Sequence, residues 1–194
     1  MRNLDFAKWE TPAVAARFSA EDFKRTLSRY ATGVAVVTTV DDEQSPCGLA
    51  VNSFTSVSME PPLVLWCLRR VSSVFDKFAA APQFCVNVLG AHQVDLAGRF
   101  SAKLGDRFAG IGYEIGTFGC PVLAGVAATL ECRTVAQHAA GDHLIFIGEV
   151  RACTHTGASP LIFHSKNYWT ASDTVQCQID HAADVVRASS LVMT

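Results

Sequence analysis

The segment between residues 48 and 58 carries a run of uncharged polar side chains that could bind a ligand. Four hydroxyls and one amide fall within seven residues, namely Asn52, Ser53, Thr55, Ser56 and Ser58. A turn would favour Gly, Pro or Asp here, and a buried strand would favour Val and Ile. Neutral hydrogen-bonding groups with free backbone N–H groups suit the polar edge of a heteroaromatic ring and its phosphate. The alternative is a half-exposed strand rich in Ser and Thr, which is common in β proteins.

The sequence lacks the motifs of several large classes of enzyme. Gly110, Gly112 and Gly116 do not have the spacing of G-x-G-x-x-G, and the P-loop, G-x-S-x-G and H-E-x-x-H are absent. His138 and His143 lie five residues apart across an expected hairpin, and we predict no metal site there. The remaining option is chemistry supplied by a cofactor that the protein binds and orients.

The composition narrows the function further. Hydrophobic residues make up 49% of the 194 residues and charged residues 18%, below the roughly 25% of ordinary soluble domains. So low a share of charged residues indicates that part of the surface is covered, most simply by a second copy of the chain. The net charge of −2 gives no nucleic-acid footprint. Seven cysteines without a C-x-x-C pair predict buried thiols rather than zinc ligands or disulfides. With no apolar run of about 18 residues and no signal peptide, we expect a cytoplasmic protein and no membrane span.

The residue patterns predict many strands with a few inserted helices. Ser19 should cap an amphipathic helix over residues 20–30, with Asp22 in the place of the capping-box Glu and Thr32-Gly33 at its end. Two more helices are expected over residues 72–81 and 92–101. We expect strands over residues 34–40, 63–68, 84–89, 126–137, 143–155 and 161–163, with a hairpin at 139–142. Because βαβ alternation is missing, we predict one mainly β domain over residues 1–194, a β-barrel with helical decorations.

Five segments, in their order along the chain, resemble the flavin reductase-like family. They are residues 32–39 (TGVAVVTT), 52–65 (NSFTSVSMEPPLVL), 84–89 (FCVNVL), 99–108 (RFSAK followed by DRF) and 141–143 (GDH). Each segment is weak evidence alone, but together they are strong, and the resemblance runs from about Phe23 to Trp169. Members of this family are the small reductases of two-component flavin-dependent monooxygenases.

The resemblance implies a split β-barrel over residues 20–171 that forms a homodimer and binds FAD or FMN. It also implies that the protein oxidises NADH or NADPH and releases reduced flavin, by diffusion, to a partner monooxygenase. Relatives with the M-E-P-P-L-V-L pattern often use FAD and NADH, which favours that pair. A tight flavin-binding electron carrier on the same barrel is an alternative, and so is a scaffold that has lost its cofactor.

The resemblance further implies where the flavin binds. Five residues would border the isoalloxazine ring, and three would follow the ribityl chain: Gly48, Leu49, Ala50, Asn52 and Ser53, then Cys67, Leu68 and Arg69. The phosphate would meet Ser72 and Ser73 at a helix start, together with Ser101, Ala102 and Lys103, of which Lys103 is the main countercharge. Without the family, Ser72 could simply cap its helix, and Lys103 could be a solvated surface charge. Cys67 would pack around the flavin rather than act as a redox thiol.

The resemblance places His143 beside the nicotinamide, presented by the turn at Gly141-Asp142. Hydride passes directly from nicotinamide C4 to flavin N5, so the rings must stack at roughly 3.5 Å and no general base is required. His143 would position the ring or stabilise developing charge; the alternative is an exposed turn residue. Tyr168 and Asn167 are expected near the pyridine nucleotide, although the family's basic-Gly-x-Tyr pattern is altered here. Residues 1–18 and 172–194 match no part of the family, and a helix over 178–192 could cover a dimer.

Overall fold

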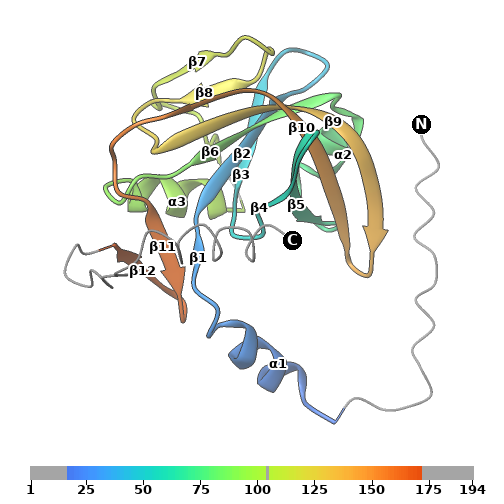
Figure 1. Ribbon diagram of the computed structural model, residues 1–194, viewed down its shortest axis with the longest axis vertical. Helices are drawn as coiled ribbons and strands as arrows, with labels where there is room; N and C mark the ends of the chain where they lie inside the picture. The colour runs from blue at the N-terminus through green and yellow to red at the C-terminus, as the bar shows by residue number, and fades with distance from the viewer. Residues whose placement is uncertain (1–16, 104, 172–194) are drawn as a thin grey trace, which may run out of the picture.

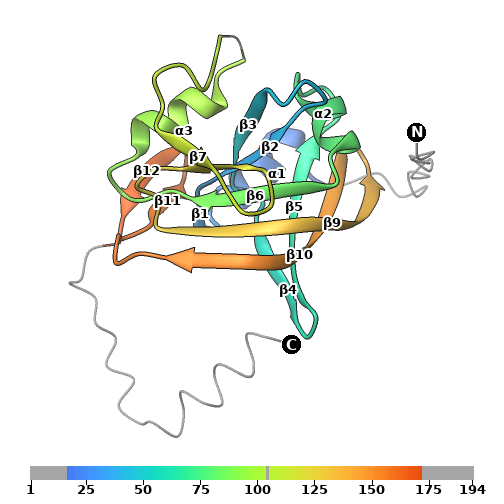
Figure 2. The ribbon, with the colours of Figure 1, turned by 90° about the horizontal axis from the view of Figure 1, so that it is seen from above.

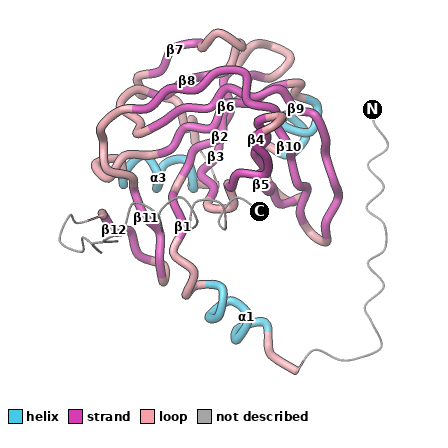
Figure 3. Tube along the Cα trace, viewed as in Figure 1, coloured by secondary structure: helices cyan, strands magenta, loops and turns pink. Residues whose placement is uncertain are grey.

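The computed structural model describes residues 17–103 and 105–171 (Figure 1). Strands dominate it, and the helices lie at its periphery (Figure 3). The helices are α1 (Ala20–Leu27), α2 (Phe75–Ala80) and α3 (Val94–Ser101). The strands are β1 (Thr32–Gly33), β2 (Ala35–Val40), β3 (Pro46–Val51), β4 (Thr55–Met59), β5 (Pro62–Arg69), β6 (Gln83–Val88), β7 (Tyr113–Ile115), β8 (Pro121–Leu123), β9 (Ala128–Ala140), β10 (His143–His155), β11 (Leu161–His164) and β12 (Asn167–Thr170).

The main sheet has seven antiparallel strands in the order β3-β2-β6-β9-β10-β5-β4. Its two edge strands, β3 and β4, follow each other in the chain and are joined by residues 52–54 alone. A link this short requires the sheet to curl until its edges approach each other. Register shifts between β9 and β10 and between β4 and β5 help the strands to bend. The result is a split barrel, the mainly β fold expected from the sequence.

Two smaller sheets complete the fold. One has the order β1-β11-β12 and the other pairs β7 with β8. Seen from above, the long β9–β10 hairpin runs along one side of the barrel and α3 lies on the other (Figure 2). Within the part of the chain that the structure describes, no helix is long and apolar enough to cross a membrane.

The strand β2 is buried on both faces, which explains why its residues are apolar or threonine and none is charged. One face contributes Ala35 and Val37 to the barrel cluster, the core enclosed by the curled sheet and α2. Its members include Val64, Trp66, Leu68, Phe78, Phe84, Leu144 and Phe146. Val34 and Val36 join the α3 cluster on the other face, with Leu89, Ala97, Phe100, Phe108, Leu123, Val126 and Leu161.

Some expected boundaries were wrong. The predicted capping box of Ser19 and Asp22 is present, but the helix ends at Leu27 rather than at Thr32-Gly33. Those two residues form β1, because they pair with Phe163 and Ile162 of β11. The short strands β7, β8 and β12 were not predicted. The helix suggested over 178–192 lies outside the described residues.

Candidate functional site

The split between β3 and β4 holds the polar segment noted in the sequence. The strand β4 pairs with β5 only as far as Thr55 opposite Leu65, so Cys67 lies beyond its reach. Ser53 replaces the missing strand, because its Oγ accepts from the Cys67 N–H at 3.0 Å and donates to the Cys67 carbonyl at 3.3 Å. Buried backbone groups need such partners. Ser53 therefore ties the β3–β4 connection to β5.

A cavity of about 190 Å³ opens beside this connection. Four of its lining residues are among those predicted from the sequence, and three are not: Ala50, Asn52, Ser101 and Tyr168, then Val34, Val51 and Phe163. The missed residues are apolar side chains of the kind that also build the core, so nothing in the sequence separated them from it. The volume is below the roughly 300–1,000 Å³ of ligand pockets, so the cavity would take only part of a large cofactor.

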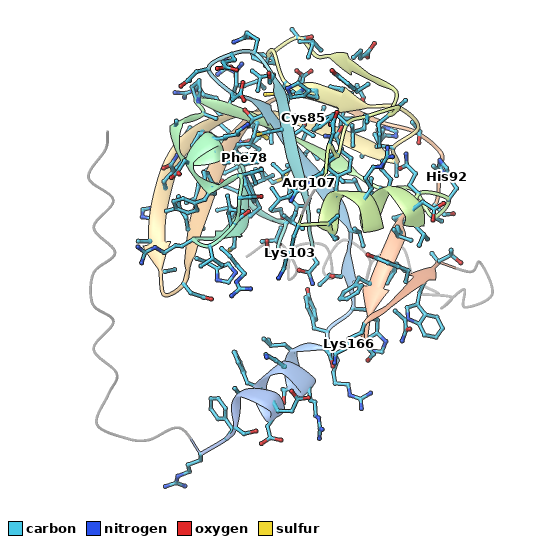
Figure 4. The ribbon with its side chains drawn as sticks, turned by 180° about the vertical axis from the view of Figure 1, so that it is seen from behind. Phe78, Cys85, His92, Lys103, Arg107 and Lys166 are labelled. Carbon is cyan, nitrogen blue, oxygen red and sulfur yellow. The ribbon has the colours of Figure 1, made fainter. Side chains whose placement is uncertain are left out.

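The segment Ser101–Lys103 begins at the end of α3, and its first residue, Ser101, lines this cavity. Ser101 donates its hydroxyl to the Ala97 carbonyl at 2.8 Å, which leaves its oxygen able to accept a hydrogen bond. Lys103 is exposed, and no carboxylate of the described residues pairs with it. It lies below Arg107, on the side of the barrel that faces α1 (Figure 4). A free ammonium at this position can attract an anion.

The prediction that Ser72 and Ser73 start a helix is wrong. The helix α2 begins only at Phe75, and its N-cap is Val74, which has no side-chain capping bond. The two serines instead precede it in a turn, in which the Ser72 carbonyl accepts from the Phe75 N–H at 3.1 Å. The dipole of α2 therefore gives no reason for a phosphate at Ser72 and Ser73.

The predicted site residues on β3 and β5 alternate between the two faces of the sheet, as strand geometry requires. Leu49 packs against the barrel cluster, and Leu68 is a fully buried member of it. Leu68 can therefore offer only its backbone to a ligand. Cys67 and Arg69 lie on the opposite face, paired with Ile145 and His143 of β10.

The β9–β10 turn forms a second group of polar side chains. Gly141 has a φ of +58°, in the left-handed region that glycine tolerates best. Asp142 then lies between two side chains, with His143 Nδ1 at 2.7 Å and Arg69 Nε at 3.7 Å. The hydrogen bond from His143 holds the pKa of the Asp142 carboxyl below its usual value. A second cavity, lined by Arg69, Arg70, Val71, Gly141 and Asp142, has a volume of about 500 Å³.

The remaining predicted residues lie on β12, where Asn167 and Tyr168 are exposed at the rim. The Tyr168 ring packs on Phe163 with 5.6 Å between centroids, and both line the first cavity. Asn167 does not line this cavity, and its Nδ2 donates to the Ser165 carbonyl at 3.0 Å. The structure thus brings Ala50, Asn52, Ser101 and Tyr168 together, whereas the β9–β10 turn borders a different cavity.

The buried thiols of the described residues are poor nucleophiles. Among residues 17–103 and 105–171, no group of three His, Cys, Asp or Glu side chains could hold a metal ion. Burial raises the pKa of Cys47 to about 11 and those of Cys120 and Cys132 to about 12. Burial also raises the pKa of Cys67. These thiols stay protonated at neutral pH, so they are packing groups rather than nucleophiles.

Known proteins resemble this chain in sequence. The model of the flavin reductase like domain matches residues 27–172. The reductase subunit HsaB of a flavin-dependent monooxygenase from Mycobacterium tuberculosis is 37% identical over 158 residues, which cover 80% of this chain and 84% of that protein. The FMN reductase (NADH) SmoA of Agrobacterium fabrum is 43% identical over 145 residues, 75% of this chain and 82% of that protein.

A solved structure agrees with these sequence relatives. The NADH:FAD oxidoreductase SgcE6 of Streptomyces globisporus, in complex with NAD and FAD fragments, superposes with a TM-score of 0.77 at 33% identity and covers 83% of this chain and 99% of that chain. Matches of this extent in both sequence and structure identify the chain as a member of the flavin reductase-like family.

Proposed function

We propose that this NAD(P)H:flavin oxidoreductase prefers NADH and FAD, and that it releases the reduced flavin for a partner monooxygenase to take up by diffusion. The relatives support the nicotinamide preference, because one is an FMN reductase (NADH) and another was solved with NAD and FAD fragments. They differ in flavin, so FAD rests on the M-E-P-P-L-V-L segment of this chain at residues 59–65 and on what the family resemblance implies for it. HsaB, a reductase subunit of a flavin-dependent monooxygenase, supports the partner class.

The observation that carries this proposal is the neutral cavity with an unpaired cation nearby. Val34, Val51 and Phe163 give the first cavity apolar walls, and Asn52 and Ser101 add uncharged hydrogen-bonding groups. Such a lining fits an aromatic ring with a polar edge. Lys103 would meet the phosphate. Bound flavin supplies the two-electron chemistry, while the protein binds and orients it.

The β9–β10 turn would position the nicotinamide. The Asp142 carboxylate accepts a hydrogen bond from Nδ1 of His143 at 2.7 Å, and this bond holds the pKa of Asp142 below its usual value. That bond fixes the orientation of the imidazole ring and leaves Nε2 available for a ligand. In our proposal Nε2 of His143 contacts the nicotinamide amide. Arg69 forms an ion pair with the other oxygen of the Asp142 carboxylate and so helps to hold it in place. His143 thus orients the hydride donor without exchanging a proton.

A homodimer is also part of the proposal. The helix α1 stands away from the barrel (Figure 1) and has no buried residue. Phe23 and Leu27 on this helix are 51% and 57% exposed, and Tyr30, just after it, is 78% exposed. A second copy would cover this surface, in line with the low charge content. Sedimentation equilibrium should give twice the chain mass, and a monomer would remove this part of the proposal.

The decisive assay crosses two flavins with two nicotinamides at steady state. We expect the highest kcat/KM for FAD with NADH. Gel filtration distinguishes the electron carrier, because a carrier would retain flavin through dilution and a reductase would lose it.

Lys103→Ala should raise the flavin KM by about tenfold, since a charge-assisted contact to phosphate is lost, whereas Lys24→Ala on α1 should not. An unchanged flavin KM in Lys103→Ala would remove the phosphate assignment.

A further inference from the structure

Arg107 connects two parts of the proposed flavin site that come from distant regions of the chain. Its Nε and Nη2 donate to the Ala102 carbonyl at 3.0 Å and 2.7 Å, and its Nη1 donates to the Gly48 carbonyl at 2.7 Å. Ala102 belongs to the proposed phosphate segment, and Gly48 belongs to the strand proposed to border the ring. Figure 4 shows Arg107 above Lys103, next to the barrel. One guanidinium thus spans both segments.

The local structure explains why an arginine is suited to this position. The strand β3 is an edge of the main sheet, so carbonyls on its outer side have no strand partner. Gly48 also lets α3 approach closely, because a Cβ there would lie 3.1 Å from Phe100 Cε1 and 3.0 Å from the Val37 carbonyl oxygen. The planar guanidinium can donate in two directions at once, which an ammonium cannot do with the same fixed geometry.

Arg99 provides an internal comparison. It lies on α3 and donates from Nη1 to the Ala109 carbonyl at 2.6 Å. Both arginines therefore anchor the connection that follows α3. The difference is that Arg99 links α3 to this connection, whereas Arg107 links the connection to β3. Of the two arginines, Arg107 is the one that joins the phosphate segment to the strand, through Ala102 and Gly48.

We propose that Arg107 is a positioning residue for the flavin phosphate. It holds Ser101, Ala102 and Lys103 at a fixed separation from the segment that borders the ring, so that Lys103 meets the phosphate of a flavin whose ring is already seated. This role rests on the proposed function of Lys103. Arg107 acts through Lys103 and touches no reacting atom.

The test compares FMN with riboflavin, which has the same ring and no phosphate. In Arg107→Met we expect the KM for FMN to rise about tenfold, as the loss of charge-assisted hydrogen bonds would predict, with kcat at saturating flavin and the KM for riboflavin within about twofold of wild type. Arg107→Lys keeps the charge but not the fork, so its KM for FMN should stay raised. Arg99→Met should leave the KM for FMN within about twofold of wild type. Unchanged riboflavin kinetics also show that each variant is folded.

The double variant Lys103→Ala/Arg107→Met tests whether Arg107 acts through Lys103. We expect its KM for FMN to equal that of Lys103→Ala alone, because residues that act as a unit are not additive. Equal losses with FMN and riboflavin, rescue by Arg107→Lys, or an additive double variant would each overturn the positioning role. If the wild-type protein reduces none of FAD, FMN and riboflavin, the proposed function itself fails, which is a separate result.

Discussion

The barrel cluster and the α3 cluster lie on opposite faces of β2 but are closed in different ways. In the barrel cluster, Trp66 contacts Phe78, Phe84 and Phe146, and it stacks on Phe146 with 4.5 Å between ring centroids. All four rings are at most 1% exposed. The α3 cluster instead runs outward, from Phe100 to Phe108 to Tyr113, and Tyr113 is 39% exposed.

This difference predicts different consequences for function. The barrel cluster is enclosed by strands and α2, so damage to it should lower the stability of the whole fold. The α3 cluster supports the helix whose last residue, Ser101, lines the first cavity. Damage to the α3 cluster should therefore change flavin binding as well as stability. Variants in the two clusters can test this separation.

The largest effect is expected from Phe146→Ala in the barrel cluster. Removing a fully buried ring leaves a cavity, and the free energy of unfolding should fall by about 3–5 kcal/mol. Urea denaturation followed by fluorescence measures this loss. The flavin KM of the remaining folded protein should be unchanged. A raised flavin KM in Phe146→Ala would show that the two clusters are not separate in function.

His143→Ala should have the next largest effect, and it acts on chemistry rather than stability. The neighbouring Leu144 belongs to the barrel cluster, whereas His143 is partly exposed. Loss of an orienting contact should slow hydride transfer by roughly tenfold to a hundredfold, measured by stopped-flow at saturating flavin. His138→Ala, an exposed histidine opposite Ile145 in the same hairpin, is the control. Equal rates in the two variants would make His143 an ordinary turn residue.

A smaller and mixed effect is expected from Phe100→Leu in the α3 cluster. The loss of ring volume should cost about 1–2 kcal/mol of unfolding free energy. Phe100 also packs closely over Gly48, because a Cβ there would lie 3.1 Å from Phe100 Cε1. A smaller side chain should let the phosphate segment shift. The flavin KM should then rise about threefold, because Lys103 moves away from the flavin phosphate. Steady-state kinetics and denaturation on the same sample measure both values. A stability loss with an unchanged flavin KM would count against the coupling.

The smallest effect concerns thiol labelling, which should leave stability unchanged. Cys153 is exposed and should react with iodoacetamide first, and the half-buried Cys67 should follow slowly. Cys47, with a pKa of about 11, is protonated at about pH 8 and should not react in the folded protein. Flavin should protect Cys67 and leave Cys153 unaffected, as peptide mapping by mass spectrometry would show. Labelling of Cys67 at the same rate with flavin present would place the flavin elsewhere.

Several features of the fold were predictable because local patterns encode them. The capping box at Ser19 and the two long strands β9 and β10 depend on residues close together in the sequence. The strand β1 was missed because Thr32 and Gly33 extend only through pairing with β11. The false helix start at Ser72 has a similar origin, since a serine before an apolar stretch fits both a cap and a turn.

The sequence alone determined that this protein is a mainly β chain with a neutral hydroxyl-rich segment and the ordered motifs of a flavin reductase. Tertiary structure decided which residues meet. Ser53 reaches Cys67 across 14 residues of sequence, and Arg107 reaches Gly48 across 59. The physical reason is that local periodicity selects the face of a strand, whereas contacts between distant segments depend on how the sheet curls and where its edges come together.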